Sequence, residues 1–244
     1  MSGQEHHARP ANPERVDFIK NVFRNRALQS REEIAAASGL VDWLGLPSHH
    51  DAQKNWDTVK CLLYALSHKK PDLPILDVGS SRSVINRWLS MMGFRNLYAC
   101  DLLAKDISYF EPYGIQFSIQ DLTNTNYETG FFSTITSISV IEHNIDLVAY
   151  LDEMARLLRP GGLLLTSTDY WSEPVDCHGI YPYGPDGGEM RIFDPDGIRE
   201  YVRLAEERGF KLTAPLDLET REKAINWQRV DRDYTFMFVA LRRR

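Results

Sequence analysis

Short runs of hydrophobic residues alternate with longer amphipathic segments from residue 74 to residue 241. The short runs are typical of buried strands, and the longer segments, with apolar residues every three or four positions, are typical of helices. The alternation of strands and helices favours an α/β fold with a mostly parallel sheet and helices on both faces. The predicted strands are 75–78, 97–100, 115–119, 134–138, 163–167, 211–214 and 234–241, and the predicted helices between them are 83–92, 145–158 and 195–208.

The first seventy residues show helical periodicity alone. A helical pattern begins at Pro13, a capping-box arrangement at Ser30 begins a second helix that we expect to end at Gly39, and Asp51 can cap a third. Residues 1–12 have no periodicity, and we expect them to be disordered. We therefore predict two parts: a disordered start with a helical extension over 1–70, acting as a lid or a partner interface, and an α/β domain over 71–244.

Composition and charge narrow the classes of function. The chain has 244 residues, of which 43% are hydrophobic, and a net charge of −6, which argues against a nucleic-acid backbone as the main partner. Its three cysteines form no C-x-x-C pair, so we expect reduced thiols, no zinc site and a cytoplasmic location. The polar N-terminus predicts no secretory signal, and no apolar run is long enough to predict a membrane span.

Acidic residues follow three successive predicted strands. Asp77-Val78-Gly79-Ser80-Ser81 spans the end of the first strand, Asp101 ends the second, and Asp121-Leu122 follows the third. In an open parallel sheet, ligands bind outside the carboxyl ends of the strands. There Gly79 allows close approach of the backbone, Asp101 can accept hydrogen bonds from ribose hydroxyls, and Asp121 with Leu122 can read an adenine. The second glycine of a G-x-G-x-x-G motif is absent, which disfavours a dinucleotide with a pyrophosphate.

These segments resemble the class I S-adenosylmethionine-dependent methyltransferase family, in its methyltransferase-11-like small-molecule branch. The resemblance runs from Ile75 to about Asp169 and includes Ser139-Val140-Ile141-Glu142-His143 and Leu158-Arg159-Pro160-Gly161-Gly162. It implies a Rossmann-like sheet of seven strands with the last strand antiparallel, and it makes 71–244 the S-adenosylmethionine-binding methyltransferase domain. The chain departs from the family's glycine-rich loop, because Ser81 and Ser83 stand at the later glycine positions.

The resemblance also implies how S-adenosylmethionine, the expected cofactor, would be held. The loop around Gly79 would approach the methionine part, Asp101 would hold the ribose, and Ser139 would lie near the sulfonium and the amino-acid group. The full set of predicted cofactor-binding residues is Asp77, Gly79, Ser80, Ser81, Asp101, Leu102, Asp121, Leu122 and Ser139.

Residues for catalysis and for binding the methyl acceptor are expected after the fourth and fifth strands. His143, His178 and Asp169 are the candidate general bases, in no fixed order, although His143 could instead belong to the first turn of a helix. Asp176 with His178 gives too few ligands for a metal site, so we predict none. The segment 169–193 is rich in aromatic residues, which suits a small organic ligand or an aromatic-packed loop. Its candidate substrate-binding residues are Tyr170, Trp171, Tyr181 and Tyr183.

The sequence thus predicts a methyltransferase that uses S-adenosylmethionine to methylate an oxygen or nitrogen of a small metabolite or glycan precursor. Two alternatives stay open: a cofactor-binding regulatory or scaffold protein without turnover, and a protein or RNA methyltransferase that needs a partner. The expected partners are a small-molecule acceptor and, through the N-terminal helices, a second copy of the chain; nucleic acid is not favoured.

Overall fold

The computed structural model describes residues 13–68, 70–80, 83–103, 107–182, 184 and 188–244. The predicted disorder of residues 1–12 lies outside this part of the chain.

A ten-stranded sheet forms the centre of the molecule, with the strand order β4-β3-β2-β5-β6-β10-β1-β8 and with β7 and β9 also paired to β10. The pairs from β4 to β6 are parallel, and β10 runs antiparallel to β6. The strands are β1 (Asn25–Ala27), β2 (Ile75–Val78), β3 (Leu97–Asp101), β4 (Gln116–Ile119), β5 (Phe132–Ile138), β6 (Leu158–Tyr170), β7 (Phe210–Leu212), β8 (Leu216–Asp217), β9 (Ile225–Trp227) and β10 (Arg232–Arg243).

This architecture confirms the predicted Rossmann-like α/β fold and its antiparallel last strand. The described strands number ten rather than seven, because β1, β8 and β9 add short segments around β10. Strands of two or three residues carry no hydrophobic periodicity, so the sequence does not reveal them.

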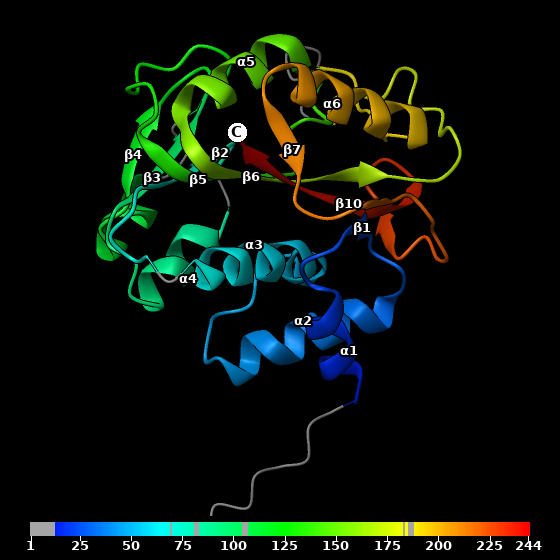
Figure 1. Cartoon of the computed structure of the whole chain (residues 1–244). Helices are drawn as coiled ribbons and strands as arrows, with labels where there is room; N and C mark the ends of the chain where they lie inside the picture. Colours follow the sequence, from blue (N-terminus) through cyan, green and yellow to red (C-terminus); the bar gives the residue numbers. More distant parts are fainter. Residues whose placement is uncertain (1–12, 69, 81–82, 104–106, 183, 185–187) are drawn as a thin grey trace, which may run out of the picture.

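Helices cover both faces of the sheet (Figure 1). On one face lie α1 (Pro13–Asn21), α2 (Arg31–Trp43), α3 (Asn55–Ser67) and α4 (Ile85–Met91); on the other lie α5 (Leu147–Leu157) and α6 (Pro195–Glu207). Short 3-10 helices are η1 (Ala52–Lys54), η2 (Ile107–Tyr109) and η3 (Glu111–Tyr113).

The long strand β10 divides the core into two clusters. Because side chains alternate along a strand, Phe236 and Phe238 pack with α3 while Met237 and Val239 pack with α5 and α6. All four side chains are buried. The paired aromatic rings of Trp56 and Phe238, 6.5 Å apart and edge to face, join α3 to this strand.

The N-terminal region differs from the prediction in three ways. α2 does not end at Gly39 but continues to Trp43, and the side chain of Ser30 makes no capping hydrogen bond. Asp51 caps η1, through the N–H of Gln53, rather than α3 itself. The strand β1 pairs with β10, so part of the predicted extension lies within the sheet. The domain boundary at residue 70 stays a prediction.

Candidate active site

The carboxyl ends of β2, β3, β4, β5 and β6 meet along one edge of the parallel part of the sheet, which we call the carboxyl edge. Because β10 is antiparallel to β6, its first residues lie at the same edge. Thr235 is the register partner of Tyr170, and Phe236 is that of Asp169. The carboxyl edge therefore gathers the loops after five strands and the start of a sixth.

Gly79 follows β2 with a positive φ of 66°, a conformation that favours glycine. A Cβ atom at this position would lie 2.6 Å from a methyl carbon of Val140, so the loop after β2 sits tightly against the loop after β5. The next residue, Ser80, donates hydrogen bonds to the Cys100 carbonyl from both its N–H and its hydroxyl, at 3.1 and 3.2 Å. Ser81 lies outside the described residues.

Asp77 is buried at the end of β2. Its Oδ1 atom accepts a hydrogen bond from the Thr136 hydroxyl at 2.6 Å, and its Oδ2 atom has no hydrogen-bond partner among the described residues. Burial raises the pKa of Asp77 to about 7, while the hydroxyls of Thr136 and Ser83 oppose the shift and the charge of Asp101 adds to it. The second oxygen is therefore a buried acceptor that the described residues leave without a hydrogen bond.

We expect Asp77→Asn to make the stability of the ligand-free chain less dependent on pH. A carboxyl whose pKa is raised from 3.8 to about 7 binds its proton more tightly in the folded state, so stability is lost as pH rises through that window. Between pH 4 and pH 7.5, this carboxyl should lower the free energy of unfolding of the unmodified chain by roughly 3–4 kcal/mol at most. The variant lacks the carboxyl, so its free energy of unfolding should fall less over the same range. Urea unfolding at both pH values measures this difference. Equal slopes in the two proteins would contradict it.

Asp101 and Leu102 stand at the end of β3, next to the loop of Gly79. The Oδ1 atom of Asp101 accepts a hydrogen bond from the N–H of Leu103 at 3.1 Å, which orients the half-buried carboxylate. Leu102 is 62% exposed, so its apolar side chain faces solvent at the carboxyl edge. An exposed leucine beside an oriented carboxylate suits a nucleoside, which has both an apolar base and a polar sugar.

Asp121 and Leu122 follow β4. Asp121 is exposed, and its Oδ1 atom accepts hydrogen bonds from the N–H and the hydroxyl of Thr123, at 2.9 and 2.7 Å. These bonds lower the pKa of Asp121, so this carboxylate stays charged at neutral pH. Leu122 is buried in the cluster on the α5 side of the sheet.

Ser139 follows β5 with a φ of 55°, unusual for a residue with a side chain. Its N–H donates to the Ser167 carbonyl at 2.9 Å, and its hydroxyl accepts a short hydrogen bond from the ammonium group of Lys54. Lys54 comes from η1 in the N-terminal region. The sequence does not predict Lys54 as a site residue, because nothing local marks it as a partner of a residue 85 positions away.

A cluster of ionisable side chains surrounds this contact, and we call it the ionic cluster. Its members are Lys54, Asp57, Glu142, Asp169 and Tyr234. The Lys54 ammonium lies 3.6 Å from a carboxylate oxygen of Asp57. The Thr168 hydroxyl donates to Glu142 at 2.9 Å, and the Ser167 hydroxyl donates to Asp57 at the same distance. All three carboxylates are buried.

Burial is the largest cause of the pKa shifts at Asp57, Asp169 and Tyr234 in the ionic cluster. Burial raises the pKa of Asp169, the charge of Glu142 raises it further, and Lys54 and Tyr234 oppose the shift. Burial also raises the pKa of Asp57, again opposed by Lys54. Burial and the charge of Asp169 raise the pKa of Tyr234, so this phenol keeps its proton at neutral pH. The Lys54 ammonium group therefore opposes the rise in pKa that burial causes at Asp57 and at Asp169.

The three candidate general bases lie in different surroundings. Asp169 belongs to the ionic cluster. His143 is half-buried in the loop after β5, where its backbone N–H donates to the Val140 carbonyl at 3.2 Å. The side chain of His178 is 91% exposed and lies 3.4 Å from a carboxylate oxygen of Glu189. The structure therefore brings His178 to the surface, away from the buried carboxyls.

The four aromatic candidates are also separated. Tyr170 is fully buried on the α6 side of the sheet, and its hydroxyl donates to the Leu218 carbonyl at 2.7 Å, so it is part of the core. Trp171 is half-buried with the Lys223 ammonium over its ring, at 5.1 Å. Tyr181 lines a hollow of about 430 Å³ together with Arg229. Tyr183 lies outside the described residues.

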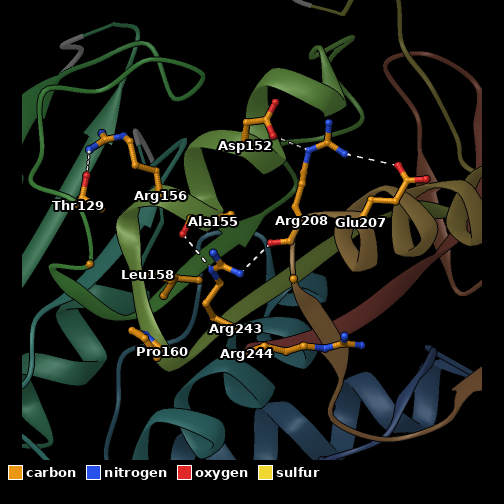
Figure 2. Close-up of a pocket in the computed structure, with 12 residues that line it drawn as sticks. Thr129, Asp152, Ala155, Arg156, Leu158, Pro160, Glu207, Arg208, Arg243 and Arg244 are labelled. Carbon is orange, nitrogen blue, oxygen red and sulfur yellow. Dashed lines mark hydrogen bonds and ion pairs between the residues drawn. The ribbon is translucent and has the colours of Figure 1, made fainter.

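A larger hollow, of about 740 Å³, lies at the opposite end of the sheet (Figure 2). Figure 2 shows the Arg243 guanidinium between the carbonyls of Ala155 and Arg208, and Arg208 directed at Asp152. These guanidinium groups satisfy the last carbonyls of α5 and α6 and stabilise the helix ends. None of the predicted site residues lines this hollow.

Within the described ranges, no group of three metal-binding side chains comes together. In the same ranges, no helix combines the length and the apolar character required to cross a bilayer.

Comparisons with known proteins agree with this fold. Residues 76–166 match the model of a methyltransferase domain family. A ubiquinone biosynthesis O-methyltransferase of Xanthomonas oryzae is 31% identical over 101 residues, which are 38% of this chain and 42% of that relative. The chain thus spans less than half of the length of the relative that it matches.

Solved structures share the fold at low sequence identity. A geranyl diphosphate C-methyltransferase of Streptomyces coelicolor, in complex with Mg²⁺, geranyl diphosphate and S-adenosyl-L-homocysteine, is similar over 97% of this chain and 100% of its own, with a TM-score of 0.59 and 16% identity. The cyclase SpnF is similar over 90% of this chain and 99% of its own, with a TM-score of 0.61 and 14% identity. Because one of these proteins is a cyclase, the fold alone does not define the reaction.

The fold and its carboxyl edge are those of a Rossmann-like α/β protein. Residues 76–166 match a methyltransferase domain family, so the predicted resemblance to the class I S-adenosylmethionine-dependent methyltransferases is confirmed.

Proposed function

We propose that this chain is an S-adenosylmethionine-dependent methyltransferase that methylates an oxygen or nitrogen of a small molecule, such as a metabolite or a glycan precursor. The observation that carries the proposal is the carboxyl edge of the matched domain. There Asp77 and Asp101 lie at the ends of β2 and β3, and Asp121 follows β4, beside the left-handed turn at Gly79. The similarity to a ubiquinone biosynthesis O-methyltransferase supports an oxygen acceptor in particular.

The residues of this edge fit S-adenosylmethionine. The buried Oδ2 atom of Asp77, which has no hydrogen-bond partner in the described part of the chain, can accept a hydrogen bond from a bound ligand. Asp101 would hold the ribose, Leu102 and Asp121 would contact the adenine, and Ser139 would lie near the methionine group. Asp121 is charged at neutral pH and can accept a hydrogen bond from the exocyclic amine.

When bound, S-adenosylmethionine would supply an activated methyl group for transfer to the acceptor. The protein then has to orient the acceptor, exclude water and remove a proton. Asp169 is a candidate for proton removal, because it is a carboxyl at the carboxyl edge and the charge of Lys54 opposes the rise in pKa that burial causes. We propose Asp169 as the general base, with Trp171 and Tyr181 as contacts for the acceptor. Residues 1–70 as a lid or dimer interface and the cytoplasmic location stay predictions from the sequence.

Two measurements on the full chain test this function. Calorimetry should detect binding of both S-adenosylmethionine and S-adenosylhomocysteine. Mass spectrometry should detect methyl transfer to at least one member of a panel of phenols, sugars, amines and carboxylic acids. Binding without transfer to any acceptor would favour a regulatory or scaffold protein. A chain that binds neither ligand would contradict the proposal.

We expect Asp169→Asn to lower turnover at least about 100-fold while changing cofactor affinity less than about threefold, because asparagine keeps the shape but cannot accept a proton. Steady-state methyl transfer with the acceptor found above, together with calorimetry, measures both quantities. His143→Ala and His178→Ala, measured in parallel, test the other two candidate bases. A larger loss in His143→Ala than in Asp169→Asn would assign the base to His143 instead.

A further inference from the structure

The position of Lys54 is fixed by the short turn that precedes α3. Asp51 caps this turn: its carbonyl accepts from the N–H of Lys54 at 3.0 Å, and its side chain accepts from the N–H of Gln53 at 3.2 Å. The Lys54 side chain is only 15% exposed. A lysine whose ammonium group is held inside the protein has lost rotamer freedom and hydration, so its contacts must compensate for both.

Three contacts hold the ammonium group at the carboxyl edge. It donates to the hydroxyl of Ser139, lies 3.6 Å from a carboxylate oxygen of Asp57, and sits 3.5 Å from the centre of the Phe236 ring. Phe236 is the register partner of Asp169 on the neighbouring strand. Side chains of register partners lie on the same face of the sheet with their Cβ atoms about 5 Å apart, so Lys54 approaches Asp169 from that face.

We propose that Lys54 is a positioning residue through which the N-terminal region prepares the carboxyl edge for methyl transfer: its ammonium group fixes Ser139 and supplies a positive charge beside Asp57, on the face of the sheet that carries Asp169. This inference rests on the proposed function. It adds to the site a residue from outside the matched segment 76–166.

The balance of charges explains why a cation is needed here. Asp169 is faced by Glu142, Asp57, Tyr234 and Lys54, of which only Lys54 is positive. Burial and two carboxylates favour the protonated form of Asp169, which cannot accept a proton from the acceptor. The ammonium group opposes this effect at both Asp169 and Asp57. The proton leaving an acceptor hydroxyl or ammonium can then pass to a carboxylate oxygen of Asp169.

Lys54→Met tests the inference, because methionine keeps much of the side-chain length and removes the charge. In the full chain labelled with ¹³C at aspartate carboxyls, the Asp169 signal is assigned by its loss in Asp169→Asn. We expect its titration midpoint to rise by about one pH unit or more in Lys54→Met. The acid limb of the pH–rate profile should move by the same amount. Lys54→Arg, which keeps the charge, should restore most of both.

Lys20→Met is the matched control, since it also removes one lysine charge but from an exposed ion pair with Asp17 in α1. It should leave the Asp169 midpoint unchanged. An unchanged midpoint in folded Lys54→Met would overturn the role of Lys54, whether or not methyl transfer is found. Failure of the proposed function is separate, because it would appear as absent cofactor binding in the unmodified chain.

Discussion

Replacing Asp101 with alanine is expected to weaken S-adenosylmethionine binding at least about 100-fold while leaving the fold intact. The half-buried carboxylate at the end of β3 is held in place by the N–H of Leu103. It is placed to accept hydrogen bonds from both ribose hydroxyls, and each such bond to a charged group contributes about 1.5–3 kcal/mol. Losing two costs roughly 3 kcal/mol or more, which corresponds to a factor of about 100 in affinity. Calorimetry with S-adenosylhomocysteine measures the change.

Asp196→Ala is the control for this variant, because it also removes one aspartate, but from a side chain that is 91% exposed in the first turn of α6. It should bind the ligand as the unmodified chain does. Circular dichroism should show that both variants are folded. Equal affinity of Asp101→Ala and the unmodified chain would remove Asp101 from the cofactor site.

Replacing Arg26 with methionine is expected to lower the free energy of unfolding by about 3–5 kcal/mol, one of the largest effects of any single change in the chain. Arg26 is buried in β1, and its guanidinium donates to both carboxylate oxygens of Glu33, at 3.0 and 2.8 Å, and to the Ala27 carbonyl. Without the arginine, the hydrogen bonds that the described residues still donate to the Glu33 carboxylate are those from Trp56 and from the N–H of Gln29. Chemical unfolding in urea measures the loss.

Arg24→Met provides the matched control two residues earlier. The Arg24 side chain is exposed, and its carbonyl, which accepts from the buried Lys60, is unaffected by the substitution. Its effect should stay within about 0.5 kcal/mol. If Arg26→Met cost less than about 1 kcal/mol, the buried ion pair would not be what holds β1 and α2 together.

The parallel part of the fold follows from sequence patterns. The runs 75–78 and 134–138 predict β2 and β5 closely, because strands buried on both faces are continuously apolar or β-branched. Helix α6 was expected over 195–208 and spans Pro195–Glu207, since Asp194 caps it and Pro195 suits its first turn. The sequence does not predict β1, because its three residues, Asn25, Arg26 and Ala27, are mostly polar yet buried.

The sequence predicts some residues of the candidate site but not others. Acidic residues at strand ends are visible in a sequence because strand ends in a parallel sheet meet at one edge. Lys54 and Asp57 were not visible, because their roles depend on η1 and α3 reaching across to Ser139 and Ser167. Such contacts join residues far apart in the chain. Tyr170 shows the opposite problem: one position after Asp169 in β6, it points to the other face and into the core.

The pairing of β1 with β10 has a consequence for the order of folding. Residues 26 and 27 pair with residues 238 and 237, and the Thr235 hydroxyl donates to the Leu28 carbonyl. During synthesis β1 therefore has neither of its described partner strands, β8 and β10, until residues 216–217 and 237–238 have been made. Contacts of such long sequence separation slow folding. Phe236, on which the Lys54 ammonium rests, arrives with the same last strand, so the candidate active site should form late. A nascent chain released before β10 is complete would lack the pairing of β1 with β10, and it would lack the Phe236 ring that contacts Lys54.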